Sequence, residues 1–210
     1  CNVSLDGGVD TTAPVVSITS PTSGSAFAGE TLAVAAQVTD EGAITLVTAE
    51  LGTASTTLAG GGGNHLGTLQ TGDLPEGPAT LTVRATDAAG NTGSATLAVT
   101  VDHTAPVVVV VEPQPNTERI ALSDVVVEAD DANGLRGVSL YEEGVSSSIG
   151  HSAAPVEGNR YGIFYSLECT TPLPRDTVFR VEATDWADNV GVATVALRLL
   201  AVPGCSRDGG

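Results

Sequence analysis

The sequence predicts an all-β protein made of two tandem antiparallel β-sandwiches. Short segments rich in β-branched residues alternate with turns that contain Gly, Pro, Asn or Asp, which is typical of small antiparallel sheets. No window shows the 3.6-residue apolar period of an amphipathic helix. Two motifs recur in the same order, which indicates tandem duplication. With 210 residues, the chain is long enough for two domains of about 100 residues each.

The duplication is visible in the letters of the chain. The segment Asp10-Thr-Thr-Ala-Pro-Val15 recurs 92 residues later as Asp102-His-Thr-Ala-Pro-Val107. The segment 85–93, Ala-Thr-Asp-Ala-Ala-Gly-Asn-Thr-Gly, recurs 98 residues later as Ala-Thr-Asp-Trp-Ala-Asp-Asn-Val-Gly. We therefore predict a tether over residues 1–12, a first domain over 13–101, a second over 102–200 and a tail over 201–210.

The strands of the first domain follow from period-two patterns and turn residues. Leu32, Val34, Ala36 and Val38 alternate with other residues, as in a strand with one buried face. The segment Ser20-Pro-Thr-Ser-Gly24 has the composition of a turn. The predicted strands cover 14–19, 31–39, 43–51, 53–59, 65–71, 81–84 and 96–101.

The second domain repeats this order of elements. Its predicted strands cover 107–111, 125–128, 135–142, 160–169, 177–184 and 192–199. The valines of 107–111 and 125–127 do not alternate with polar residues, so we expect both faces of these strands to be covered. The cover is either an edge shielded inside the sandwich or a contact with another subunit.

The repeated motifs resemble those of tandem bacterial immunoglobulin-like repeats, which occur in surface proteins, adhesin stalks and secreted multidomain enzymes. The opening D-x-T-A-P-V and the closing A-T-D-x-A-x-N-x-G both occur twice, and the resemblance covers about 190 of the 210 residues. It implies two immunoglobulin-like sandwiches in an exported protein, without implying one activity. The Cys-Trp-Cys core of antibody domains is absent from the sequence.

Acidic residues gather where the immunoglobulin topology brings three loops to one end of each domain. Oxygen ligands of this kind suit Ca²⁺, which takes six to eight of them, and the resemblance implies calcium at such positions in some bacterial stalks. The alternative is turn chemistry alone, in which each Asp caps its own loop. The candidate ligands are Asp10, Asp40, Glu41, Asp87 and Asn91 in the first set, and Asp102, Asp130, Asp131, Asp185, Asp188 and Asn189 in the second.

The charge balance excludes several partners. Asp and Glu number 25 against 8 basic residues, which gives a net charge of −17. Such a chain repels nucleic-acid phosphates and anionic lipid surfaces. We therefore expect no nucleic-acid partner, and membrane association only through a lipid anchor.

The three cysteines predict an exported protein. The chain has no Met and starts at Cys1, and this start resembles a mature bacterial lipoprotein, whose first Cys is lipidated. Cys169 and Cys205 fall at the same end of the second domain in the expected topology, so we expect a disulfide between them. The expected location is the bacterial cell surface.

The sequence contains no motif for catalysis. His65, His103 and His151 lack neighbours at metal-ligand spacing, and we expect all three in solvated loops. Trp186 is expected to fill space between the domains, although it could also stack on a sugar. Tyr141, Tyr161, Phe164 and Tyr165 form a possible binding patch, with Phe164 and one Tyr face expected in the core.

The function expected from these features is that of a non-enzymatic extracellular module, structural or adhesive, that spaces or presents a binding surface. The alternative is a self-assembling subunit of an extracellular filament or surface layer, joined by strand addition of the N-terminal segment. A weaker alternative is an accessory carbohydrate-binding module of a secreted hydrolase. A protein partner, self or other, is favoured over a glycan.

Overall fold

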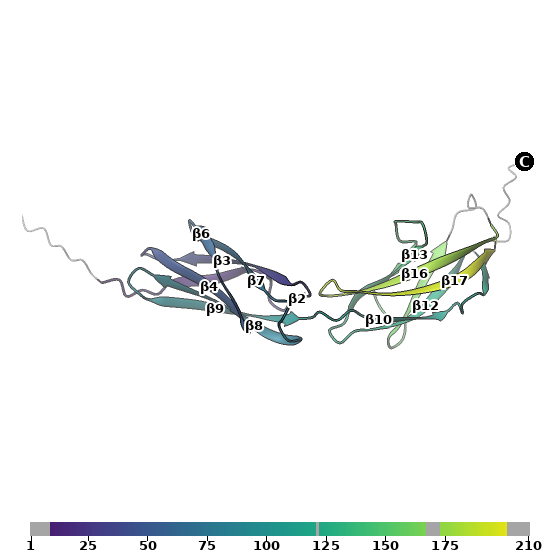
Figure 1. Cartoon of the computed structure of the whole chain (residues 1–210), viewed down its shortest axis with the longest axis horizontal. Coiled ribbons are helices and arrows are strands. Elements are labelled where there is room, and N and C mark those ends of the chain that lie inside the picture. Colours follow the sequence, from purple (N-terminus) through teal and green to yellow (C-terminus); the bar gives the residue numbers. More distant parts are fainter. Residues whose placement is uncertain (1–8, 121, 167–172, 201–210) are drawn as a thin grey trace, which may run out of the picture. The chain divides into compact units, whose positions relative to one another are not determined.

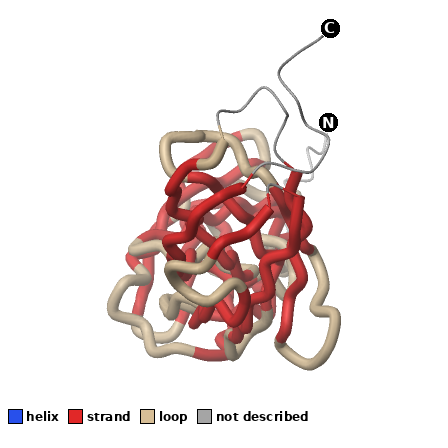
Figure 2. Tube along the Cα trace, turned by 90° about the vertical axis from the view of Figure 1, so that its right-hand side faces the viewer, coloured by secondary structure: helices blue, strands red, loops and turns tan. Residues whose placement is uncertain are grey.

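The computed structural model describes residues 9–120, 122–166 and 173–200, and these residues form strands and loops (Figures 1 and 2). They divide into two compact units, with the boundary between His103 and Thr104. The described residues contain no helix that is long and apolar enough to cross a membrane.

Unit one is a sandwich of two sheets. The first sheet has the order β1-β3-β7-β6 and the second the order β2-β9-β8-β4-β5. Neighbouring strands are antiparallel, except that β2 runs parallel to β9. The strands are β1 (Val15–Ser20), β2 (Ala26–Phe27), β3 (Thr31–Thr39), β4 (Ile44–Leu51), β5 (Ala54–Thr57), β6 (Ala59–Gly61), β7 (Asn64–Gln70), β8 (Gly77–Asp87) and β9 (Thr92–Val101).

Unit two repeats this arrangement. Its sheets have the orders β10-β12-β15 and β11-β17-β16-β13-β14, so β10 to β17 correspond to strands of unit one in the same relative places. The short β11 runs parallel to β17, as β2 does to β9. The strands are β10 (Val107–Glu112), β11 (Glu118–Ile120), β12 (Leu122–Asp130), β13 (Leu135–Glu142), β14 (Gly150–Ser152), β15 (Arg160–Ser166), β16 (Arg175–Asp185) and β17 (Val190–Leu200).

Each unit has its own aliphatic core between its two sheets. In unit one, the alternating side chains of β3 face inward together with fully buried Leu51, Leu69 and Leu81. In unit two, the Tyr165 and Phe179 rings meet edge to face, with centroids 4.8 Å apart. Burial of these apolar groups is the main term that stabilises each sandwich.

Two equivalent glycines show that the sequence repeat is also a repeat of structure. Gly93 is the second residue of β9 and lies next to the carbonyl of Pro14, and Gly191 is the second residue of β17 and lies next to the carbonyl of Pro106. A Cβ added at Gly93 would lie 1.8 Å from the Pro14 oxygen, and one at Gly191 would lie 1.9 Å from the Pro106 oxygen. The first and last strands of each unit therefore approach so closely that only glycine fits.

The valine-rich strands correct one expectation. Val125 and Val127 are fully buried and Val108 and Val110 pack on the core, but Val107 and Val109 are 68% and 54% exposed. The period-two geometry of a strand turns these two valines to the outer face of edge strand β10. The expectation of an edge shielded inside the sandwich is therefore wrong.

Candidate functional site: an aspartate triad in unit one

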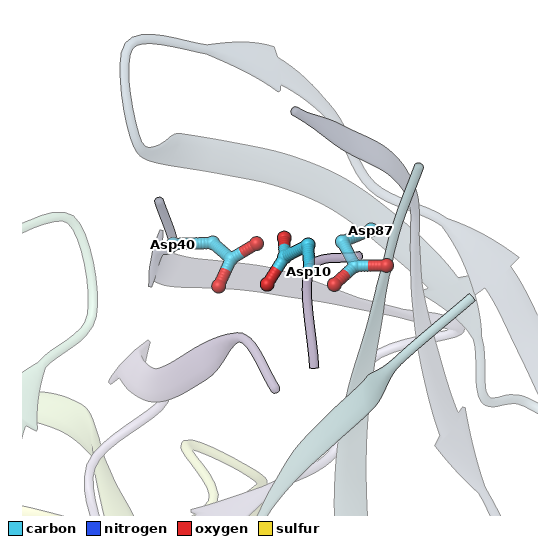
Figure 3. A group of neighbouring side chains, drawn as sticks. All are labelled: Asp10, Asp40 and Asp87. Carbon is cyan, nitrogen blue, oxygen red and sulfur yellow. The ribbon is translucent and has the colours of Figure 1, made fainter. Parts of the chain in front are cut away.

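Three carboxylates that are far apart in the sequence come together in unit one. Asp10 precedes β1, Asp40 follows β3, and Asp87 ends β8. One carboxylate oxygen from each lies within 4.8 Å of the others, and Asp10 stands between Asp40 and Asp87 (Figure 3). We call these residues the aspartate triad.

Local hydrogen bonds fix two members of the triad. Asp10 Oδ1 accepts a hydrogen bond from the Thr12 amide at 3.0 Å, and Asp40 Oδ2 accepts one from the Gly42 amide at 3.2 Å. A Cβ at Gly42 would lie 2.5 Å from Asp10 Oδ2. The absence of a side chain at Gly42 therefore gives Asp10 its place beside Asp40.

The third member is held by Asn91. The Asn91 amide donates to Asp87 Oδ1 and the Asn91 side-chain Nδ2 donates to Asp87 Oδ2, both at 2.8 Å. The same Nδ2 lies 3.1 Å from the Asp10 carbonyl oxygen and donates to it. Asn91 therefore locks the loop after β8 and ties it to the start of β1, which is the role that turn chemistry predicts for this motif.

The hydrogen bonds around Asp87 also set its charge. Burial by itself raises the pKa of Asp87, but the hydrogen bonds from the Asn91 side chain and from the amides of Asn91, Gly90 and Ala89 outweigh burial. The pKa of Asp87 is consequently lower than that of an ordinary Asp. The carboxylate stays ionised at neutral pH, next to two others.

One oxygen of the triad has no hydrogen-bond partner. Oδ1 of Asp40 is buried, and no donor in the described part of the chain reaches it. A buried carboxylate oxygen without a partner is costly in a folded protein. Hard oxygens converging in this way are the donor set that Ca²⁺ prefers.

Unit two repeats the loop chemistry. Asp185 is fully buried, and its Oδ1 accepts from the amides of Ala187 at 2.8 Å and Asn189 at 2.9 Å. Asn189 Nδ2 donates to Asp185 Oδ2 at 2.8 Å. An oxygen of Asp131 lies within 4.8 Å of one of Asp185, and Asp131 Oδ1 also accepts from the Asn133 amide at 2.8 Å.

Several predicted ligands lie outside these groups. Asp188 forms an ion pair with Arg136 at the surface, and Glu41 and Asp130 are exposed. Asp130 is the last residue of β12 and lies on the outer face of that strand, so its side chain is exposed. These three lie outside the two groups of converging carboxylates, and their role as ligands stays a prediction. Asp102 belongs to unit one, and its assignment to the second set stays a prediction from the repeated motif.

Two expectations about the aromatic residues are wrong. Tyr161, a member of the expected binding patch, is buried, whereas Phe164, which was expected in the core, is 59% exposed. Both lie on β15. Tyr161, Ile163 and Tyr165 point to the inner face of this strand, and Phe164 points to its outer face. Tyr141 supports the Arg180 guanidinium, 4.7 Å from its ring centroid.

Trp186 is 60% exposed, beside Gly134. Its role between the domains stays a prediction.

The histidines also differ from expectation. His65 is buried on β7, on the same parity as Leu69, so it does not lie in a solvated loop. His151 is exposed but lies on β14, with Nδ1 3.1 Å from Ser139 Oγ. His103 Nδ1 lies 2.8 Å from the Ala28 carbonyl oxygen, an interaction between distant segments that the sequence does not signal.

The cysteines Cys1, Cys169 and Cys205 lie outside the described residues. The lipid anchor and the disulfide therefore stay predictions.

The two-sheet packing and the strand order define each unit as an immunoglobulin-like β-sandwich. Residues 14–99 match the model of the family described as bacterial Ig domain. The resemblance read from the repeated motifs is thereby confirmed.

One solved structure agrees with the fold over most of the chain, and a second is similar over part of it. The fibronectin(III)-like modules of CbhA from Clostridium thermocellum are 18% identical, with a TM-score of 0.56, over 93% of this chain and 100% of that one. The endo-beta-1,4-mannanase from Thermotoga petrophila is 19% identical, with a TM-score of 0.40, over 47% of this chain and 22% of that one. No curated protein matches the sequence.

Proposed function

We propose that the chain is a non-enzymatic module at the bacterial cell surface that spaces or presents a binding surface, and that its aspartate triad binds Ca²⁺. The support for the module is its fold and family, because bacterial Ig domains are typical of extracellular or surface proteins. The lipid anchor at Cys1 and the disulfide between Cys169 and Cys205 belong to the same proposal on sequence grounds.

The observation behind the calcium site is the buried Asp40 Oδ1 that has no hydrogen-bond partner. It lies in a group whose other members, Asp10 and Asp87, contribute nearby carboxylate oxygens. A bound cation would satisfy that oxygen and reduce the mutual repulsion of the three charges. The ion would also connect the segment before β1 to the loops after β3 and β8, and so would stiffen this end of unit one.

We extend the proposal to unit two, where Asp131 and Asp185 repeat part of the arrangement. Their loops are already closed by hydrogen bonds to the backbone and to Asn189. Calcium would add to this turn chemistry without replacing it.

The surface assignment is tested on intact cells of the source bacterium. Labelling with an impermeant antibody, and shaving with protease, should reach the protein, and mass spectrometry of its N-terminal peptide should show acyl chains on Cys1. Protein that is protected from protease until the cells are lysed would contradict the surface assignment. An unmodified thiol at Cys1 in the native protein would contradict the anchor.

Exposed Val107 and Val109 favour one alternative, a self-assembling subunit. They lie on edge strand β10, where another chain could add a strand or cover the valines. Sedimentation of the full chain over a range of concentrations separates the two functions. A spacer sediments as a monomer throughout, whereas a subunit shows association that the double variant Val107→Glu/Val109→Glu abolishes.

A further inference from the structure

Unit one contains a polar pocket whose lining is separate from the aspartate triad. It has a volume of about 360 Å³ and is lined by Ala28, Glu30, Gln70, Gly72, Asp73 and His103. The lining thus combines one imidazole with two carboxylates. No positively charged side chain is among these six residues, so the pocket favours a cation.

The imidazole of His103 is oriented by the protein backbone. Its Nδ1 lies 2.8 Å from the Ala28 carbonyl oxygen, and a carbonyl oxygen can only accept. Nδ1 therefore bears the proton in this hydrogen bond, and the neutral ring presents Nε2 as a lone pair. A histidine whose Nδ1–H bonds a backbone carbonyl has the geometry that orients metal-binding histidines.

Among the described residues, that lone pair accepts no hydrogen bond. Nε2 of His103 is buried, and no donor in the described residues reaches it. A buried nitrogen without a partner is as exceptional as the buried Asp40 oxygen, and it requires an explanation. The His103 amide is bonded as well, because it donates to Glu76 Oε1 at 2.8 Å, so the backbone at His103 is held in place.

The two carboxylates of the lining can approach an ion beside Nε2. Glu30 and Asp73 are exposed, so their side chains can rotate at little cost. The Glu30 side chain runs along Gly72, where an added Cβ would be 3.4 Å from its Cγ. An imidazole nitrogen with two carboxylate oxygens is a ligand set of Zn²⁺ and similar ions, whereas Ca²⁺ takes oxygens alone.

We propose that this pocket binds a divalent transition-metal ion, such as Zn²⁺, through His103 Nε2 and the carboxylates of Glu30 and Asp73. The site is distinct from the aspartate triad in place and in ligand chemistry. A metal here would join the segment after β2, the loop after β7 and the end of unit one.

The test is isothermal titration of the metal-free full chain with Zn²⁺. The cysteines are alkylated beforehand so that thiolates cannot bind zinc. Excess Ca²⁺ is present so that oxygen-only sites are occupied. His103→Gln keeps a side-chain N–H for the Ala28 carbonyl but lacks the imidazole nitrogen, and His151→Gln is the matched control on an exposed histidine of unit two.

The wild type and His151→Gln should bind one Zn²⁺ with equal affinity. His103→Gln should bind at least tenfold more weakly, since even the loss of an outer-shell partner costs 10–100-fold. The double variant Glu30→Gln/Asp73→Asn should weaken zinc binding to a similar extent, with an unchanged melting temperature in chelator.

Two results would overturn the proposal. One is a wild-type chain that takes up no zinc, and the other is a His103→Gln variant that binds zinc as the wild type does. Imidazole ¹⁵N spectra provide a direct second readout, because zinc should shift Nε2 of His103 and leave that of His151 unchanged.

Discussion

The close approach of the first and last strands in each unit predicts a large effect of one methyl group. In Gly93→Ala, the new Cβ would lie 1.8 Å from the Pro14 carbonyl oxygen, whereas an ordinary contact needs at least 3.4 Å. The oxygen belongs to the backbone and the Cβ is held rigidly by its Cα, so no side-chain rotation can relieve the contact. Either β9 or the segment before β1 has to move by about 1.6 Å, which is the difference between these distances.

The cost can be estimated from overpacked cores. Forced shifts of this kind cost about 1–3 kcal/mol, and the upper end applies because only backbone can move. For a domain of about 100 residues, 1 kcal/mol corresponds to about 4–8 °C in the melting temperature. We therefore expect unit one of Gly93→Ala to melt at least about 12 °C lower than in the wild type. Gly191→Ala should do the same to unit two, where the distance is 1.9 Å.

Differential scanning calorimetry of the full chain measures both effects. Gly61→Ala is the matched control, because no atom lies within 4 Å of its added Cβ. That variant should change the unfolding free energy by no more than about 0.5 kcal/mol. If Gly93→Ala melts like Gly61→Ala, the contact between the first and last strands does not constrain unit one, and the argument fails.

Three further predictions concern the core and the triad. Phe179→Ala removes a fully buried ring that packs on Tyr165, so unit two should lose about 3–5 kcal/mol in a urea titration; a loss under 1 kcal/mol would contradict the packing. Because the folded pKa of Asp87 is lowered, its stabilisation is present above the ordinary Asp value and is lost as the pH falls through the lower, folded pKa. In calcium-free buffer, unit one should therefore lose stability below about pH 4. Asp87→Asn should reduce this pH dependence, and parallel profiles of stability against pH for the wild type and the variant would refute the prediction. Gly42→Ala places a methyl group 2.5 Å from Asp10 Oδ2, so calcium titration should show several-fold weaker binding, and unchanged affinity would argue against the triad.

Much of the fold is predictable because apolar and polar residues alternate along many of the strands. The strands predicted over 31–39 and 135–142 agree with β3 and β13 residue for residue, since the inward positions of β3 are apolar in sequence and β13 has inward Val138 and Leu140. The short β2, β11 and β14 were not predicted. Strands of two or three residues have too few positions to show a period, and their pairing depends on distant partners.

The site is predictable where the motif fixes the loop. Asp10, Asp40 and Asp87 come together because the immunoglobulin topology places the start of the first strand beside the loops after β3 and β8. Glu41 could not be separated from Asp40 by sequence, since the direction of each side chain depends on the turn.

The wrong predictions for the aromatic residues arise because the sequence does not show which face of the strand each side chain occupies. The sequence of β15 contains apolar residues on both faces, so it does not show that Tyr161 points inward and Phe164 outward. The pocket at His103 was also missed, because its Glu30 and Asp73 come from distant parts of unit one and share no motif.

The most direct test of the central claim is to measure calcium binding by the full chain, using scanning calorimetry and isothermal titration. Asp40→Asn removes the charge of the partnerless oxygen, and neighbouring exposed Glu41→Gln removes one charge outside the triad. At calcium 100-fold above its dissociation constant, we expect unit one of the wild type and of Glu41→Gln to gain about 2.7 kcal/mol. In Asp40→Asn that gain should be largely lost. Melting curves of the wild type that are identical in calcium and in chelator would contradict the account.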